Sequence, residues 1–234
     1  MISTGQIVIL LVFMLLSMII SSQLKSRFRK YSKIAVNYGM TGKDVAEKML
    51  YENGISDVSV VSVQGELTDH YNPANKTVNL SRDVYFGQSV SAAAVAAHET
   101  GHAIQHARAY AMLQFRSALV PLQNISAKVM NIIFIAMFFG AFAFQKILSF
   151  ELAITIIIVC YAIFTLFAVV TLPVEIDASR RALVWLNSSN VTNIETHDKA
   201  KDALKWAAYT YVVAALSSLA MLLYFIFMLL GRRE

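Results

Sequence analysis

The 234-residue chain has the composition of a membrane protein: 57% of its residues are hydrophobic and only 15% are charged, against about 25% charged residues in a soluble domain. Its formal net charge of +5 is not arranged as a basic patch with stacking aromatic side chains, so we expect no nucleic-acid partner. The single cysteine, Cys160, excludes an intrachain disulfide.

The chain begins with an apolar stretch, residues 7–22, that contains no charged side chain. With the two residues before it, this stretch is long enough to cross roughly 30 Å of hydrocarbon. A cleavable signal peptide carries positive charge before its apolar run, whereas here the basic residues follow, at Lys25, Arg27, Arg29, Lys30 and Lys33. Because cytoplasmic segments are enriched in Lys and Arg, we predict an N-terminus outside and a chain that is cytoplasmic from residue 23 onward.

A short amphipathic helix is predicted next, at residues 41–53. Thr41 and Asp44 resemble a capping box at its start, and Gly54 is suited to the position just past its end.

After this helix, the spacing of the apolar residues changes from the helical period to the two-residue period of β-strands. Residues 58–63 and 76–81 are predicted as strands, and residues 69–75 have the composition of a turn. We therefore expect a β-hairpin ahead of the next helix. The edge formed by residues 76–81 could bind an extended substrate through main-chain hydrogen bonds.

His98, Glu99 and His102 form an HExxH pattern behind an alanine-rich run at residues 91–97. Alanine is the best helix former, and residues i and i+4 share a helical face, so both imidazoles can reach one metal ion. Glu99 is rotated about 100° from His98, where it can act as the general base of a zinc hydrolase. A chance match is the alternative, but the chain has only five histidines. Gly101 costs about 1 kcal/mol of helix propensity, which favours a tight packing contact there.

Three further spans are predicted after an amphipathic stretch at residues 108–123. They are residues 125–144, 152–172 and 207–230, with a short turn at 145–151 and a polar segment at 173–206. Arg232 and Arg233 then lie outside, contrary to the charge rule. The predicted organisation is an N-terminal transmembrane helix (1–22), a cytoplasmic α+β segment (23–124), two transmembrane helices (125–172), a cytoplasmic helix (173–206) and a C-terminal transmembrane helix (207–234).

A catalytic zinc site has three protein ligands and an open position for water, and all three must lie on one side of the membrane. Glu175 is the best candidate because it follows the third span directly and shares a helical face with Ala178. Pro173 suits the first turn of that helix, and Asp177 could orient a histidine through its second N–H. The alternative is that Glu175 is an interfacial charge favoured by a helix N-terminus.

Three stretches together resemble the YugP family of membrane neutral zinc metallopeptidases. They are DHYNPANKTVNLS at 69–81, SVSAAAVAAHETGHAIQ at 89–105 and LPVEIDASRRA at 172–182. The resemblance covers essentially the whole chain and implies His98 and His102 as zinc ligands and Glu99 as the catalytic residue. The place of Glu175 is similar to that in the HtpX and CaaX-protease type, which has a gluzincin-like ligand set. Those enzymes usually have an acid four residues further on, where this chain has Ser179.

These patterns predict a zinc metalloendopeptidase with one Zn²⁺ per chain, in which Glu99 takes a proton from water and passes it to the leaving amine. An oxyanion needs a further donor, and the candidates are His106, His70, Tyr71, Tyr85, Arg180 and His197. Each also has a simpler interpretation as an ordinary surface, turn or loop side chain, and the sequence does not choose among them.

The predicted fold is a mainly α polytopic membrane protein with about four transmembrane helices and a small cytoplasmic α+β zinc-peptidase part. We expect it in the cell membrane with its active site facing the cytoplasm, acting on membrane-proximal protein or peptide segments, with an unidentified membrane adaptor as a further partner. One alternative is an intramembrane site-2-type zinc protease, although the later spans lack the Asp-Gly motif of that class. The other is a non-catalytic zinc-binding membrane adaptor, although structural zinc sites usually have four ligands, often cysteines.

Overall fold

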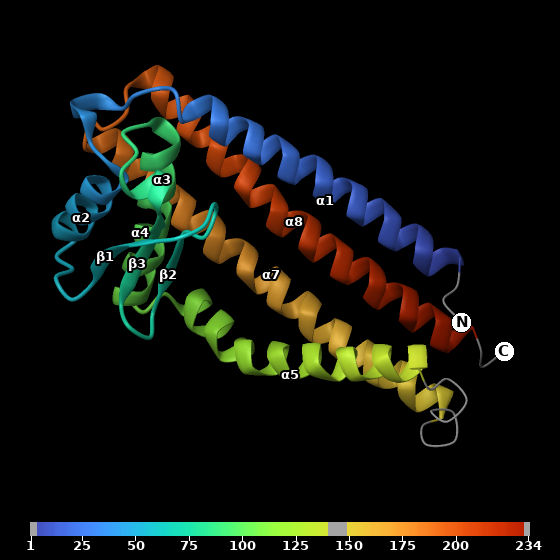
Figure 1. Cartoon of the computed structure of the whole chain (residues 1–234). Coiled ribbons are helices and arrows are strands. Elements are labelled where there is room, and N and C mark those ends of the chain that lie inside the picture. The colour runs from blue at the N-terminus through green and yellow to red at the C-terminus, as the bar shows by residue number, and fades with distance from the viewer. Residues whose placement is uncertain (1–3, 140–148, 232–234) are drawn as a thin grey trace. The chain divides into compact units, whose positions relative to one another are not determined.

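A computed structural model describes residues 4–139 and 149–231 of the chain (Figure 1). The last residues of the predicted second span, most of the predicted turn at 145–151, and Arg232 and Arg233 lie outside the described residues.

Four long helices carry the predicted spans, and all four are long and apolar enough to cross a membrane. They are α1 (Thr4–Tyr31), α5 (Ala111–Phe139), α7 (Phe150–Ser188) and α8 (Ile194–Leu230). The predicted fold class, a mainly helical membrane protein with a small sheet, is therefore confirmed.

Pro173 does not begin a helix, contrary to the prediction, but lies inside α7. The same helix thus continues from the apolar third span through Glu175 to Ser188. Proline removes one backbone donor from a helix. Helices near hydrocarbon nevertheless tolerate it, because a broken helix would leave several backbone groups without partners.

The chain separates into two compact units. The first is drawn from residues 1–18, 115–171 and 211–234, and its core includes Met130, Cys160 and Phe225. The second is drawn from residues 19–114 and 172–210 and contains every predicted site residue.

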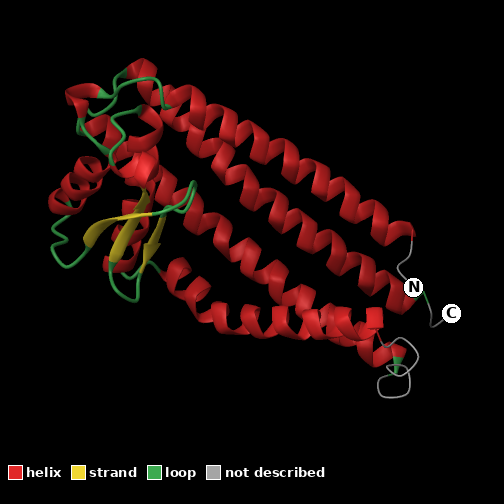
Figure 2. Cartoon of the chain, in the orientation of Figure 1, coloured by secondary structure: helices red, strands yellow, loops and turns green. Residues whose placement is uncertain are grey.

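The small sheet of the second unit has three strands, β1 (Ser59–Val63), β2 (His70–Asn72) and β3 (Thr77–Ser81), in the order β1-β3-β2 (Figure 2). A hairpin precedes the helix of the HExxH pattern as predicted, but it pairs β2 with β3, and β2 lies in the segment interpreted as a turn. The valine-rich β1 pairs with β3 in parallel. Because β3 is bonded on both sides, the prediction that residues 76–81 form a substrate-binding edge is wrong.

Helix α4 (Val90–Ala107), which carries the HExxH pattern, is the centre of this unit. Its alanine-rich first half is buried against α2 (Gly42–Glu52), beside the short helix α3 (Arg82–Tyr85) and the sheet (Figure 1). The capping box of α2 forms as predicted: the Asp44 amide donates to Thr41 Oγ1 at 3.2 Å, and the Thr41 amide donates to Asp44 Oδ2 at 2.9 Å. Gly54 follows with a φ of 71°. These local signals fix α2, which in turn holds α4.

Candidate metal centre

The second half of α4 carries both histidines of the HExxH pattern. The helix starts at Ser89, whose hydroxyl accepts a hydrogen bond from the Ala92 amide at 3.3 Å. The alanines that follow are small, so neighbouring elements approach α4 closely. His98 and His102 then project from one face of the helix, as their spacing requires.

Glu175 of α7 meets these two imidazoles. Its Oε2 lies 3.3 Å from His98 Nε2 and 3.5 Å from His102 Nε2. The three possible ligand atoms all lie within 4.8 Å of one another, and all three side chains are at most 12% exposed. The structure thus brings the three predicted ligands together.

The donor set fits a zinc ion. With bonds of 2.0–2.1 Å in a tetrahedron, two donors lie about 3.3 Å apart, close to the observed separations of 3.3 and 3.5 Å. Two imidazoles and one carboxylate are a ligand set of catalytic zinc sites, which leaves the fourth position for water or substrate.

A close helix contact sets the position of Glu175. A Cβ atom on Gly101 would lie only 2.7 Å from the carbonyl oxygen of Ala178, so only glycine allows α4 and α7 to approach this closely. The predicted tight packing contact at Gly101 is confirmed. Ala178 lies one helical turn after Glu175, so the contact holds that turn of α7 against the histidines.

Gln105 orients His102, a role that the sequence did not reveal. Its Nε2 donates to the Val174 carbonyl at 2.8 Å and to Asp177 Oδ2 at 2.9 Å. Both partners can only accept, so the amide oxygen of Gln105 must face His102 Nδ1, 3.0 Å away. His102 therefore carries a proton on Nδ1, so that when the ring is neutral the lone pair of Nε2 is free to bind a metal ion beside Glu175. The available signal was a glutamine three residues after His102, on the same side of the helix.

Asp177 has a different role from the predicted one. It accepts hydrogen bonds from Gln105, from Arg180 at 2.8 Å and from Arg181 at 2.5 Å. Among the described residues no hydrogen bond joins it to a histidine, so it acts on His102 only through Gln105. Ser179 lies 3.1 Å from His98 Nδ1 through its hydroxyl. Ser179, at the position where the HtpX and CaaX-protease type usually has an acid, thus contacts a histidine directly.

Glu99 lies outside the three-ligand cluster and is held by the sheet. Its Oε2 accepts a hydrogen bond from the backbone N–H of Tyr71 in β2 at 3.0 Å. The Tyr71 hydroxyl lies 2.8 Å from His106 Nδ1, one turn of α4 beyond His102. The carboxylate therefore has a fixed partner on one side and the metal-binding face of α4 on the other.

Comparison with known proteins agrees with this geometry. A family model described as "Putative neutral zinc metallopeptidase" matches residues 6–230. The chain belongs to this family. It is also 39% identical over 213 residues to "Putative membrane protease YugP" of Bacillus subtilis (strain 168), covering 91% of each chain. No solved structure matches the chain significantly.

The charges of this neutral zinc metallopeptidase family member are arranged for cation binding. Glu175 lies beyond the charge-free part of α7. Burial opposes its ionisation, but hydrogen bonds and charge from His102 and His98 outweigh burial and lower the pKa of the carboxyl. Burial likewise disfavours the charged form of His102, yet Glu175 and Glu99 raise its pKa above the usual 6.5. Carboxylates that stabilise imidazolium will equally stabilise a divalent cation at the same place.

Of the six candidates for an oxyanion donor, Arg180 is bonded to Asp177 and Tyr85 packs edge-on against Phe86. The other four form two groups. Tyr71 and His106 are bonded to each other on the face of α4 that carries Glu99 and His102. His70 bonds to the Thr68 carbonyl at 2.8 Å in its own loop, and His197 lies 3.4 Å from the Thr192 hydroxyl. The structure therefore favours the first pair over the second.

Proposed function

We propose that this protein is a membrane zinc endopeptidase that hydrolyses peptide bonds in membrane-proximal protein segments at the cytoplasmic face. The observation that carries the proposal is the place of Glu99. Its carboxylate stands next to a buried His-His-Glu cluster, and a backbone N–H of an adjacent strand orients it. A metal site that serves structure alone has no use for such a carboxylate.

Different residues of the site have different roles in the proposed hydrolysis. His98, His102 and Glu175 would hold one zinc ion, which when bound supplies Lewis-acid polarisation of a carbonyl and acidification of water. Glu99 accepts the proton of the attacking water and delivers it to the leaving amine. The N–H of Tyr71 limits the rotation of Glu99, so the carboxylate remains aimed at the reacting water.

The free edge of β2 is suited to the substrate. The Tyr71 N–H points away from β3 and toward Glu99, so this edge faces the catalytic carboxylate. An extended peptide could pair along it by main-chain hydrogen bonds. Peptides N-methylated at successive positions should show one or two positions at which cleavage fails, whereas uniform tolerance of N-methylation would exclude strand pairing.

Two variants of the purified full chain test the catalytic proposal. Glu99→Gln should keep one zinc per chain and lose cleavage of an unfolded protein such as casein, by at least a hundredfold, because the general base is gone. Glu175→Ala should lose most of its zinc. The matched control is Glu47→Gln, which removes the same charge from an exposed site on α2 and should change neither property. Normal cleavage by Glu99→Gln would refute the peptidase and favour the zinc-binding adaptor.

A labelling experiment tests the orientation. Ser62 is exposed on β1, so Ser62→Cys in a Cys160→Ala background presents one accessible thiol. The basic residues after the first span predict that an impermeant reagent fails to label it in intact cells and succeeds after permeabilisation. Efficient labelling of intact cells would place the site on the outer face.

A further inference from the structure

Residues of α7 and α8 line a groove of about 480 Å³. Its lining residues recur every three or four positions along each helix, so each helix contributes one continuous stripe. Of its lining residues, Ser179 and Arg180 also take part in hydrogen bonds around the candidate metal centre, and the rest have no role there.

The groove is cationic. Arg180, Lys201 and Lys205 line it, and none of its lining residues is acidic. Arg180 is 73% exposed and uses one side of its guanidinium for Asp177. Lys205 lies over the Tyr209 ring at 5.6 Å, which leaves its charge in place. Lys201 has no ion pair within the described residues.

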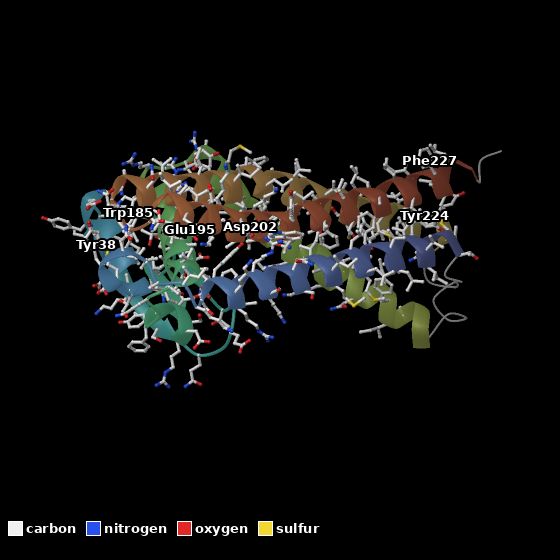
Figure 3. The ribbon with its side chains drawn as sticks, turned by 90° about the horizontal axis from the view of Figure 1, so that it is seen from above. Tyr38, Trp185, Glu195, Asp202, Tyr224 and Phe227 are labelled. Atoms are coloured by element: carbon white, nitrogen blue, oxygen red, sulfur yellow. The ribbon has the colours of Figure 1, made fainter. Side chains whose placement is uncertain are left out.

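Nearby acidic side chains do not cancel this charge. Asp202 is the acid of α8 next in sequence to Lys201, and it extends toward α1 (Figure 3). There it accepts hydrogen bonds from Arg27 and from the Tyr31 hydroxyl. Glu195 of α8 likewise pairs with Lys199. Asp198, one turn before Lys201, is not among the residues that line the groove, so the cations of the lining are available to an anion.

The groove also offers apolar surface. Ile176 and Val184 are 55% and 64% exposed in its wall, and Leu183 and Leu204 line it further in. A small inorganic anion would use the cations and leave these side chains in water. An amphiphile with an anionic head and an apolar body would use both kinds of surface.

The position of the groove along α7 and α8 indicates which kind of amphiphile it binds. On α7 it begins four residues after Leu172, the last residue of the predicted third span. On α8 it ends at Ala208, within the last apolar run. Because both positions lie at the ends of apolar runs, we place them at the depth of lipid headgroups, where basic pockets between membrane helices bind anionic headgroups. We propose that this groove binds the headgroup of an anionic phospholipid, with the phosphate among Arg180, Lys201 and Lys205.

The site adjoins the metal centre. Ser179 lines the groove and contacts His98 Nδ1, and Ile176 follows Glu175 directly. A bound lipid would therefore touch the same turn of α7 that carries one predicted ligand.

Native mass spectrometry of the full chain in detergent tests the inference, with dioleoyl phosphatidylglycerol and dioleoyl phosphatidylcholine as probes. The wild type should retain phosphatidylglycerol in preference to phosphatidylcholine. Lys201→Gln/Lys205→Gln should bind phosphatidylglycerol about thirtyfold more weakly, with unchanged zinc content. Lys30→Gln/Lys33→Gln is the matched control: it removes two exposed charges near the first span and should bind within about twofold of wild type.

Three results would overturn the inference. Equal loss in both double variants would mean non-specific charge attraction. Displacement of the lipid by millimolar inorganic phosphate would mean a site for a free anion. Unchanged lipid binding with a raised KM for acidic peptides in Lys201→Gln/Lys205→Gln would assign the groove to substrate.

Discussion

The contact at Gly101 makes a quantitative prediction about zinc. In Gly101→Ala the new methyl group would lie 2.7 Å from the Ala178 carbonyl oxygen, whereas ordinary van der Waals contact begins at 3.4 Å. The obstacle is backbone, so α7 and α4 must separate by about 0.7 Å. Ligand distances in a zinc site tolerate about 0.2 Å. The displacement of Glu175 from the histidines is therefore several times larger than the site can absorb.

The effect on stability should be smaller than the effect on the metal. Alanine improves the helix propensity of α4 by about 1 kcal/mol, and overpacking costs typically 1–3 kcal/mol, so the net loss should be at most about 2 kcal/mol. Zinc affinity should fall by about a hundredfold or more, since one of three ligands is displaced.

The assay is zinc content of the purified protein after dialysis against a graded series of chelator concentrations, with thermal unfolding of the same samples. Gly42→Ala is the matched control: it also places a methyl group against a backbone carbonyl, 2.2 Å from Val84 O, but in α2. It should lose stability and keep its zinc affinity. If Gly101→Ala binds zinc as tightly as wild type, the packing of α4 on α7 does not position Glu175, and the reasoning fails.

Three further predictions concern the surroundings of the site. Gln105→Leu should lower zinc affinity by 10–100-fold, because His102 Nδ1 and Asp177 each lose a partner. Chelator competition measures this affinity. An unchanged value would mean that His102 is oriented without the Gln105 amide. Because the pKa of His102 is raised above 6.5, protons compete with zinc up to and beyond that pH. Zinc affinity should therefore rise at least tenfold per pH unit between pH 5 and 6.5, and a flat profile would contradict this. Burial raises the pKa of the Asp69 carboxyl in the folded state, so folding favours its protonated form. This stabilising contribution is complete below the usual pKa of an aspartate and is lost as the pH rises through the raised value. Asp69→Asn should therefore gain stability over wild type as pH rises from 4 to 7 in thermal unfolding, and a loss would show that the bonds from Ser81 to the carboxylate outweigh burial.

The sequence predicted what depends on local periodicity and charge. The spacing of His98 and His102 needs only a helix to place both imidazoles on one face. Glu175 could be proposed because membrane topology restricts which residues can meet. Gly101 could be singled out because a glycine in a helix has a cost that needs a reason.

The features that could not be predicted from the sequence depend on contacts between distant segments. Gln105 gains its role from Val174 and Asp177 on another helix, and no local pattern records that pairing. β2 has only three residues, too few for an alternating pattern, and its composition is that of a turn. The continuity of α7 through Pro173 also ran against a local rule, because backbone bonding near hydrocarbon outweighs the preference of one proline.

Because α7 is continuous through Pro173, a tilt of its apolar part also moves Glu175. From the middle of its apolar stretch, near residue 162, to Glu175 is 13 residues, or about 20 Å of helix. A rigid rod of that length that tilts by only about 2° moves its end by about 0.7 Å, the same displacement that the Gly101→Ala methyl group would impose. Changes in bilayer thickness tilt membrane helices by far more than this. We therefore expect the geometry of the three predicted ligands, and with it the affinity for zinc, to depend on the thickness of the lipid or detergent that surrounds the protein.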